Sequence, residues 1–305
     1  GCDAFGEYTF LSMFIDDQDH DHEGLIHFFA SGNSANFGIG CPEFPDKYGT
    51  ILEGGQTAKN SITVGNLRKT PQNAIRGSSS RGPTLDGRIK PEVVAIGTSV
   101  KSTYTNNNYN NLTGTSMACP ATTGSAVLIS EKYQEMNSGS YPDSDVLRNV
   151  ISNSASDRGN PGPDFIFGFG MVNVPNAVQI IENDQIIESS IQDGKQNSHT
   201  ITIPSGAQSV KIMLHWSDPS AMPLSPKSLI NDLNLSADDN GTQFLPLVPD
   251  PSNPGNNAIQ SIDTINTYEQ ITIGNPGTSI SLTVEGSNIP EGPQDYTITY
   301  FADMG

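Results

Sequence analysis

The stretch Gly114-Thr115-Ser116-Met117-Ala118-Cys119-Pro120 places one serine among small residues, and the run ATTGSAVLISEKY follows it directly. This pattern predicts a helix over roughly 115–136, with Ser116 in its first turn. Unpaired backbone N–H groups and the dipole at a helix N-terminus favour a developing negative charge, which is the setting that acyl-transfer chemistry uses. The alternative is a plain N-cap, which is the more common reason for a serine before a helix.

The sequence on both sides of this stretch, up to residue 185, alternates short apolar runs with helix-like segments. The apolar runs lie at 25–30, 61–65 and 92–96, and a second helix is predicted over 143–152. Buried strands that alternate with helices predict a parallel sheet in an α/β domain. Since a doubly wound domain usually has more strands than these, we expect either a small sheet or further strands upstream of this chain.

The periodicity changes near residue 186, where polar residues begin to alternate with β-branched or aromatic ones. The segments HTITI, SVKIMLHW, TYEQITI, TSISLTVEG and QDYTITYF show this alternation, and Gly, Pro and Asn turns separate them. Such segments predict an antiparallel sandwich or barrel. We therefore divide the chain into an α/β domain, residues 1–185, and an all-β sandwich or jelly-roll/β-barrel domain, residues 186–305.

Composition excludes several classes of partner. The 305 residues include 15 Lys+Arg and 33 Asp+Glu, a net charge of −18, of which −10 falls after residue 185. This charge opposes binding to nucleic acid or to anionic membrane surfaces, and no run approaches the roughly 20 apolar residues of a membrane span. Cys2, Cys41 and Cys119 are too few for a disulfide scaffold and too widely spaced for a zinc site. A Cys2–Cys41 bridge stays open in an oxidising compartment.

The stretch GTSMACP resembles the GTSMA-x-P nucleophile motif of the subtilisin-like serine proteases, the subtilase family. Four further blocks resemble that family in the same order: LIHFFASGN ending at Asn33, TAKNSITVG at 57–65, SSSRGPTLDGRIKP at 78–91 and GFGMVNV at 168–174. Beyond residue 186, LHWSDPSA, LINDLNL and the run at 288–299 resemble the C-terminal β-barrel of the oxidatively stable alkaline protease group. That barrel is similar to the jelly-roll domain of kexin-like convertases.

This resemblance implies a secreted, extracellular endopeptidase that acts on proteins or peptides and needs no cofactor for catalysis. Ser116 would be the nucleophile, and the Asn33 side chain together with the Ser116 backbone N–H would form the oxyanion hole. The resemblance also implies a set of residues that contact the substrate, namely Ala30, Ser31, Gly32, Gly55 and Thr115.

The serine needs a base that is oriented by a third group. The family supplies these from two motifs, D-T/S-G and H-G-T-H, and neither occurs in this chain. None of its five histidines is followed by Gly-Thr-His. We therefore expect the chain to be the C-terminal part of a longer protease, whose missing N-terminal part is its partner, and to be inactive alone.

Two acidic segments invite a metal interpretation. The run at 16–23 alternates His with carboxylates, but a solvated acidic face is the favoured interpretation. Asn231, Asp232 and Asn234 offer the hard oxygen ligands of a structural Ca²⁺ site, and relatives implied by the resemblance bind Ca²⁺ in this domain. The alternative function is a non-catalytic pseudoprotease or adhesion module, with the acidic β-domain binding glycan, protein or calcium.

Overall fold

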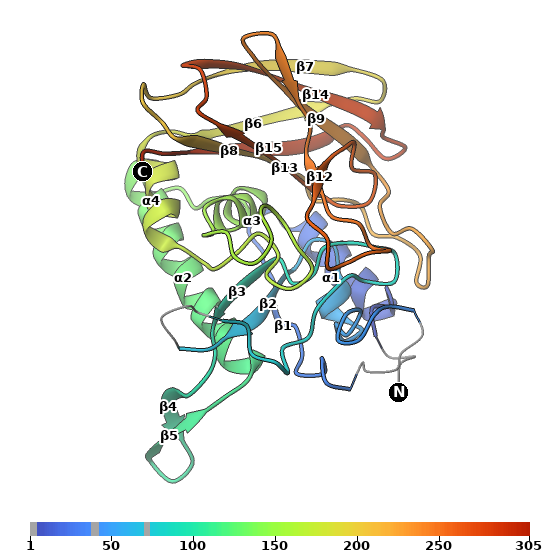
Figure 1. Ribbon diagram of the computed structural model, residues 1–305, viewed down its shortest axis with the longest axis vertical. Coiled ribbons are helices and arrows are strands. Elements are labelled where there is room, and N and C mark those ends of the chain that lie inside the picture. Colours follow the sequence, from blue (N-terminus) through green and yellow to red (C-terminus); the bar gives the residue numbers. More distant parts are fainter. Residues whose placement is uncertain (1–4, 38–42, 70–73) are drawn as a thin grey trace.

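The computed structural model describes residues 5–37, 43–69 and 74–305. Helices and a small parallel sheet occupy the chain as far as Glu182, and only strands follow from Ile186 (Figure 1). The elements of the first half are α1 (Phe10–Asp21), β1 (Phe28–Ala30), the 3₁₀ helix η2 (Gly55–Thr57), β2 (Ile62–Leu67), β3 (Val93–Ile96), β4 (Val100–Tyr104), β5 (Asn108–Leu112), α2 (Thr115–Met136), α3 (Ser144–Asn153) and α4 (Val174–Glu182).

The parallel sheet has three strands in the order β1-β2-β3. Phe28 lies opposite Ile62, and Val64 lies opposite Val93. Every residue of β2 is buried, because a central parallel strand is covered on both faces. By contrast, β1 is an edge strand in the described part of the chain, and its three residues are only partly buried. The three predicted strands are thus present, shifted by one to three residues at their ends.

The helix α2 has the predicted bounds and packs against all three strands of this sheet. Its apolar face, including Ala118, Ala126 and Ile129, joins the core of the first half. Pro120 lies inside the helix and has no N–H to donate to the carbonyl of Ser116. The backbone of the first turn, where Ser116 lies, is therefore less tightly bonded than the rest of the helix.

A two-stranded hairpin, β4 with β5, projects from the body just before α2 (Figure 1). Four of the five residues of β4 and all five of β5 are exposed. The sequence prediction missed this hairpin, because its few apolar and aromatic side chains, such as Val100, Tyr109 and Leu112, do not alternate regularly with polar ones. Its turn uses left-handed backbone at Asn106 and Asn107, both residues that tolerate a positive φ.

The second half contains two four-stranded antiparallel sheets, in the orders β10-β9-β14-β7 and β13-β8-β15-β6. Both sheets contribute to one buried core that includes Trp216, Leu235 and Val284. No strand pair joins the two sheets in the part of the chain that is described, so of the sandwich and barrel that we expected as alternatives, this half forms two separate sheets and no closed barrel. Its strands are β6 (Ile186–Ile191), β7 (Gln196–Thr202), β8 (Ser209–His215), β9 (Asp232–Asp239), β10 (Thr242–Phe244), β11 (Leu247–Val248), β12 (Ile259–Gln260), β13 (Tyr268–Gly274), β14 (Ser279–Asn288) and β15 (Gln294–Asp303).

The two halves share a buried boundary. Met213, Tyr268 and Phe301, all from the sheet β13-β8-β15-β6, belong to the hydrophobic core of the first half. From α3, the Asn149 amide donates to the carbonyls of Met213 and Thr297 (3.1 and 2.7 Å), and the Asn153 amide donates to the Thr299 carbonyl (3.0 Å). This sheet is therefore covered on both faces, unlike a simple antiparallel sheet.

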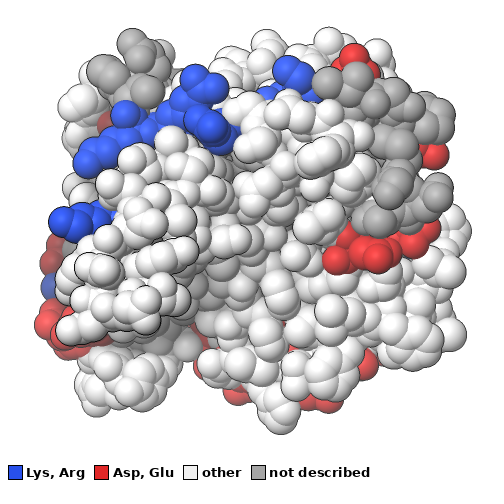
Figure 2. Space-filling model, turned by 90° about the horizontal axis from the view of Figure 1, so that it is seen from below, with Lys and Arg blue, Asp and Glu red and all other residues white. Residues whose placement is uncertain are grey.

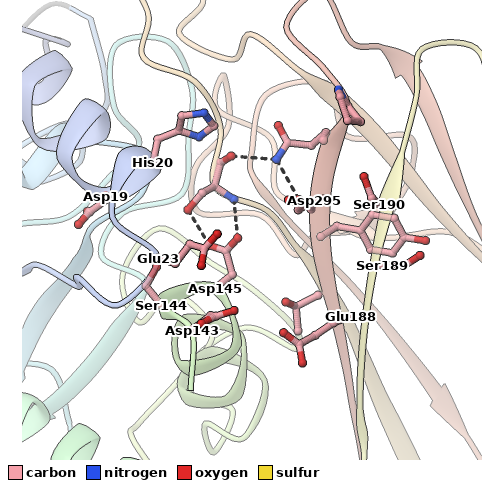
Figure 3. Close-up of a pocket in the computed structure, with 15 residues that line it drawn as sticks. Asp19, His20, Glu23, Asp143, Ser144, Asp145, Glu188, Ser189, Ser190 and Asp295 are labelled. Carbon is pink, nitrogen blue, oxygen red and sulfur yellow. Dashed lines mark hydrogen bonds between the residues drawn. The ribbon is translucent and has the colours of Figure 1, made fainter. Parts of the chain in front are cut away.

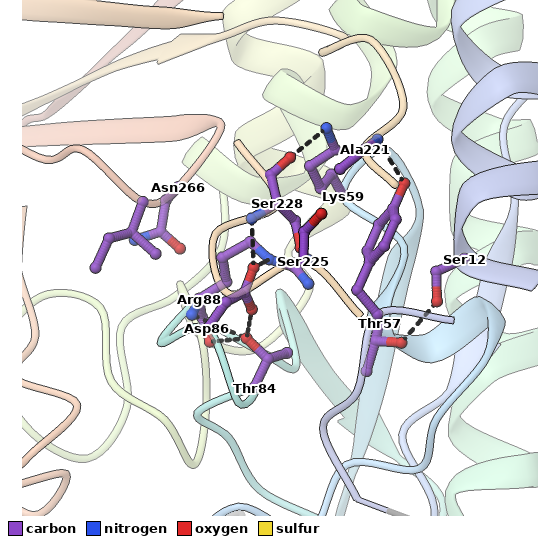
Figure 4. A network of polar contacts seen from close by, with 12 residues as sticks. Ser12, Thr57, Lys59, Thr84, Asp86, Arg88, Ala221, Ser225, Ser228 and Asn266 are labelled. Atoms are coloured by element: carbon purple, nitrogen blue, oxygen red, sulfur yellow. Dashed lines mark hydrogen bonds and ion pairs between the residues drawn. The ribbon is translucent and has the colours of Figure 1, made fainter. Parts of the chain in front are cut away.

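A second set of polar contacts between the two halves involves Tyr8, Asp86, Ala221 and Ser228 (Figure 4). The Asp86 carboxylate binds Arg88 within the first half and accepts the N–H of Ser228 (3.2 Å) from the sandwich half. Nearby, the Tyr8 hydroxyl accepts the Ala221 N–H (3.2 Å). Polar groups of both halves are thus paired with each other, as buried polar groups require.

Two further sequence expectations concern membranes and cysteines. Across residues 5–37, 43–69 and 74–305, no helix is long and apolar enough to cross a membrane.

Cys2 and Cys41 lie outside the described residues, so their pairing stays a prediction. Cys119 is a half-buried free thiol on α2, and burial raises its pKa. It therefore has the character of a small packing residue and not of a reactive thiolate.

Candidate active site

Ser116 is exposed at the second position of α2, directly after the buried pair Gly114 and Thr115. Gly114 is the N-cap residue, and its carbonyl accepts the N–H of Met117 (3.1 Å). The helix therefore begins as the sequence predicted, and Ser116 lies at the end where the dipole is positive. Ser116 is not the N-cap residue, and α2 has no side-chain capping hydrogen bond. The plain N-cap interpretation therefore does not explain why a serine stands at this position.

Asn33 lies next to this turn although it is more than 80 residues away in the sequence. Its Oδ1 accepts the backbone N–H of Thr115 (3.1 Å), and the N–H of Gly32 donates to Thr115 Oγ1 (3.3 Å). A Cβ atom built on Gly114 would lie 3.5 Å from Asn33 Nδ2. The structure thus brings Gly32, Asn33, Thr115 and Ser116 together, and both Asn33 and Ser116 are exposed.

The loop at 78–83 braces the segment that carries Asn33. Ser80 N–H donates to the Gly32 carbonyl (2.9 Å), and Ser34 N–H donates to Ser80 Oγ (3.0 Å). Gly32 has a φ of +106°, and a Cβ there would come within 2.8 Å of Ser80 Oγ. A glycine therefore suits this position, because L residues rarely adopt this φ and a Cβ would clash with Ser80 Oγ.

The residues expected to contact substrate include two, Ala30 and Ser31, at the end of β1 and one, Gly55, in η2. Ser31 is buried, with its N–H bonded to the Val64 carbonyl (3.0 Å), and Ala30 is partly buried at the end of β1. Gly55 lies in η2, directly against the ring of Phe29, where a Cβ would approach a ring carbon to 2.2 Å. The space over Gly55 is thus filled by a side chain of the chain itself.

The histidines do not supply a base to this serine. His20 and His22 are exposed, while His27 Nδ1 pairs with Asp19 (2.8 Å). In the sandwich, His199 bonds the Tyr296 hydroxyl (2.8 Å) and His215 Nδ1 bonds the Thr267 carbonyl (2.9 Å). All five histidines are described, and none of their hydrogen bonds goes to Ser116.

The charged residues are distributed unevenly around the molecule. The face seen from below, from which the β4–β5 hairpin projects, is largely uncharged, with Lys and Arg gathered on one side and Asp and Glu toward the rim (Figure 2).

One acidic pocket of about 550 Å³ lies where the two halves meet (Figure 3). Its carboxylates come from α1 and its C-terminal side, from the start of α3, from β6 and from β15: Asp19, Glu23, Asp143, Asp145, Glu188 and Asp295. Burial and neighbouring carboxylates raise the pKa values of Asp143 and Glu188. Burial alone would raise the pKa of Asp145, but its contacts with His215 and Arg148 lower it. Ser116 and Asn33 do not line this pocket, so it is separate from the candidate active site.

Comparison with known proteins agrees with this geometry. Residues 2–170 match the subtilase family, so the chain belongs to that family of serine peptidases. It is 34% identical over 160 residues to subtilisin DY of Bacillus licheniformis, a match that covers 51% of this chain and 47% of that protein. It is 32% identical over 157 residues to subtilisin Savinase of Lederbergia lenta, covering 51% and 47%. A match to serine protease AprX of Bacillus subtilis (strain 168) has 29% identity over 174 residues and covers 51% of this chain and 35% of the relative.

Each of these matches covers about half of this chain. The chain spans about half the length of the curated relatives that it matches first, since 47% of subtilisin DY is covered. The family assignment confirms what the five sequence blocks predicted. The sequence did not indicate the hydrogen bonds that link Asn66 to Gly97 and Gly97 to Gly114, the first residue of the turn that carries Ser116.

Proposed function

We propose that this chain is the nucleophile-bearing part of a subtilisin-like serine endopeptidase. The observation that carries the proposal is the contact of Asn33 with Thr115, which holds an exposed amide beside an exposed serine at a helix N-terminus. A scaffold would not need this arrangement, which favours an enzyme over a pseudoprotease or adhesion module. Extracellular peptide hydrolysis is the activity that fits a member of this family.

In the proposed reaction, Ser116 Oγ attacks the carbonyl carbon of a peptide bond while a base takes the hydroxyl proton. The negative charge that develops on the carbonyl oxygen is stabilised by Asn33 Nδ2–H and by the Ser116 backbone N–H. The Asn33 amide suits this role because Thr115 N–H engages its oxygen, which leaves the Nδ2 side to donate. The amine leaves with a proton from the base, and water then hydrolyses the acyl-enzyme.

We infer that a separate segment of the same protease supplies the Asp and His and docks on the first half. Three apolar surfaces support this inference: Phe10, Leu11 and Phe14 on α1, the partly buried edge strand β1, and Val127 with Leu128 on α2, all exposed or part-exposed. A helix of a globular protein normally buries such side chains. We call this chain together with that segment the parent polypeptide.

Substrate recognition would use the largely uncharged face around the β4–β5 hairpin (Figure 2). Ala30, Ser31 and Gly32 would form one wall of the substrate site, with Thr115 beside them. Because Phe29 fills the space over Gly55, that glycine would contact substrate only if the ring moves.

For the sandwich, we propose a jelly-roll fold, supported by two four-stranded antiparallel sheets around one core. A structural Ca²⁺ site near β9 is supported by two buried oxygens without partners, Asp232 Oδ1 and Asn234 Oδ1. Asn231 fits less well, because both ends of its amide are bonded to the segment at 291–294. No cluster of three His, Cys, Asp or Glu side chains that could hold a metal occurs among the described residues, so backbone or amide oxygens would complete the site.

The test is serine-directed labelling of the isolated chain and of the parent polypeptide with a fluorophosphonate. We expect efficient labelling of Ser116 in the parent polypeptide and little in the isolated chain, because a serine without its base is a weak nucleophile. Efficient labelling of the isolated chain would contradict the need for a second segment. Absence of labelling in both would favour the pseudoprotease.

A further inference from the structure

Asn66 is a fully buried polar residue in β2, underneath the first turn of α2. Its neighbours in the strand, Val64 and Leu67, are apolar core residues. Asn66 does not belong to the motif at 114–120, and its side chain is closed off from solvent, so it cannot contact a substrate directly. Its contacts nevertheless lead to Ser116.

The Asn66 side chain holds the loop that follows β3. Asn66 Oδ1 accepts the N–H of Gly97 (3.1 Å) and the hydroxyl of Thr98 (3.2 Å). The Gly97 carbonyl in turn accepts the N–H of Gly114 (3.0 Å), the residue two positions before Ser116. A continuous path of hydrogen bonds therefore runs from Asn66 through Gly97 to Gly114. We call the turn Gly114–Met117, which carries Ser116, the nucleophile turn.

Gly97 is where this path is most tightly packed. A Cβ atom there would come within 2.5 Å of the Gly114 carbonyl oxygen, 2.8 Å of Asn66 Oδ1 and 2.9 Å of the Ala118 N. The backbone of the loop, the amide of Asn66 and the first turn of α2 thus meet at one point. Because these groups are closely packed and hydrogen-bonded, a displacement of the Asn66 amide would displace Gly97, and the displacement of Gly97 would move Gly114.

The other end of the Asn66 side chain argues against a purely stabilising role. Its Nδ2 is buried and has no hydrogen-bond partner among the described residues. An unpaired buried donor is destabilising, so a smaller residue here would relieve a penalty. Gly97 N–H also has a second acceptor, the Leu67 carbonyl (3.2 Å), and would not be left unpaired.

We propose that Asn66 is a positioning residue for the nucleophile, which fixes the Gly97–Gly114 contact and through it the orientation of Ser116. The proposal rests on the proposed function of Ser116, but its structural part can be tested without any activity. The first test is amide hydrogen–deuterium exchange on the 305-residue chain with Asn66→Ala, Asn66→Asp and, as a control, Thr299→Val. Thr299 is a buried hydrogen-bonding residue of the boundary with α3, away from the nucleophile turn.

We expect Asn66→Ala to speed exchange of the Gly97 and Gly114 amides by about tenfold or more, since the loop loses both bonds to Asn66 Oδ1 and Gly97 N–H keeps only the longer bond to the Leu67 carbonyl. Asn66→Asp keeps the acceptor oxygen and should leave these two amides close to the unmodified chain. Thr299→Val should speed exchange at α3 and not at Gly114. Equal exchange at Gly97 and Gly114 in Asn66→Ala and the unmodified chain would overturn the proposal.

The second test measures peptide hydrolysis by the parent polypeptide. Asn66→Ala should lower kcat by about 10- to 100-fold with KM within about twofold, because small displacements of a reacting group have effects of this size. Its melting temperature should change little, and Asn66→Asp should restore most of kcat. A kcat unchanged in Asn66→Ala, in a protein that Ser116→Ala inactivates, would overturn the positioning role alone. Activity that survives Ser116→Ala would instead overturn the proposed function and this inference with it.

Discussion

The Lys59 ammonium group of the first half is paired with the Asp218 carboxylate of the second, and neither side chain is accessible to solvent. Lys59 lies just before β2, and Asp218 lies in the loop after β8. Lys59 also donates to the carbonyl oxygen of Ser228 (2.8 Å), and Asp218 accepts the N–H groups of Ile230 and Asn231. The Lys59 ammonium group thus has its partners in the second half of the chain. The Asp218 carboxylate has one partner in the first half, Lys59, and two backbone N–H groups in its own half.

Replacing Lys59 with Met should destabilise the chain by about 3–5 kcal/mol, because the Asp218 carboxylate would remain buried without its cation. Urea unfolding followed by circular dichroism measures this directly. The matched control is Lys227→Met, which removes a half-exposed lysine 3.5 Å from Asp232 and should cost less than about 1 kcal/mol. Equal losses in the two variants would contradict the importance of the buried pair.

The shared boundary also predicts how the chain unfolds. Met213, Tyr268 and Phe301 lie in the core of the first half, and side-chain amides of α3 donate hydrogen bonds to two strands of the sandwich, β8 and β15. Neither half can unfold without exposing this boundary, so calorimetry should show one cooperative transition with equal calorimetric and van't Hoff enthalpies. Two separate transitions would mean that the halves are independent modules.

Lys211 should make stability depend on pH in the alkaline range. It donates to the Ala155 carbonyl (2.6 Å), and burial lowers its pKa to about 8. The unfolded chain keeps this proton up to about pH 10.4, so stability should rise as pH increases from about 8 to 10. We expect a gain of roughly 1–3 kcal/mol, since the side chain is partly exposed.

The variant Lys211→Met should flatten this part of the pH profile, measured by urea unfolding at several pH values. Lys195→Met serves as control, because Lys195 is exposed in the turn between β6 and β7 and keeps its hydration on folding. A profile that still rises between pH 8 and 10 in Lys211→Met would assign the effect to other groups.

Sequence patterns predicted the first half well because its signals are local and strong. From the small residues around Ser116 and the apolar run after them, the sequence predicts a helix over about 115–136. The observed helix α2 has these bounds. The alternation after residue 186 likewise located five of the long strands, including β8 and β14. The division of the chain at 185 and 186 falls between α4, which ends at Glu182, and β6.

The features that the sequence could not reveal depend on contacts between distant segments. Asn66 looks like any polar residue at the end of an apolar run, and only the folded chain shows that it bonds Gly97, which in turn bonds Gly114. The β4–β5 hairpin lacks an apolar face, so no periodicity marks it. The contact between Lys59 and Asp218 spans 159 residues and has no local signal.

Within the parent polypeptide, Asn33→Ala should lower kcat for peptide hydrolysis by about 10²–10³ with little change in KM, because the amide binds the oxygen mainly when it carries charge. Steady-state kinetics measures the two constants separately. The chain should fold normally, since Asn33 is exposed. A large change in KM with kcat preserved would place Asn33 in substrate binding and not in the oxyanion hole.

The most direct test of the central claim is hydrolysis of an unfolded protein substrate by the parent polypeptide and by its Ser116→Ala variant, purified side by side. The exposed position of Ser116 means that the substitution leaves the fold intact, which a melting curve verifies. Our account predicts that kcat/KM falls by at least about 10⁴-fold in Ser116→Ala. Hydrolysis at the unmodified rate by Ser116→Ala would contradict it.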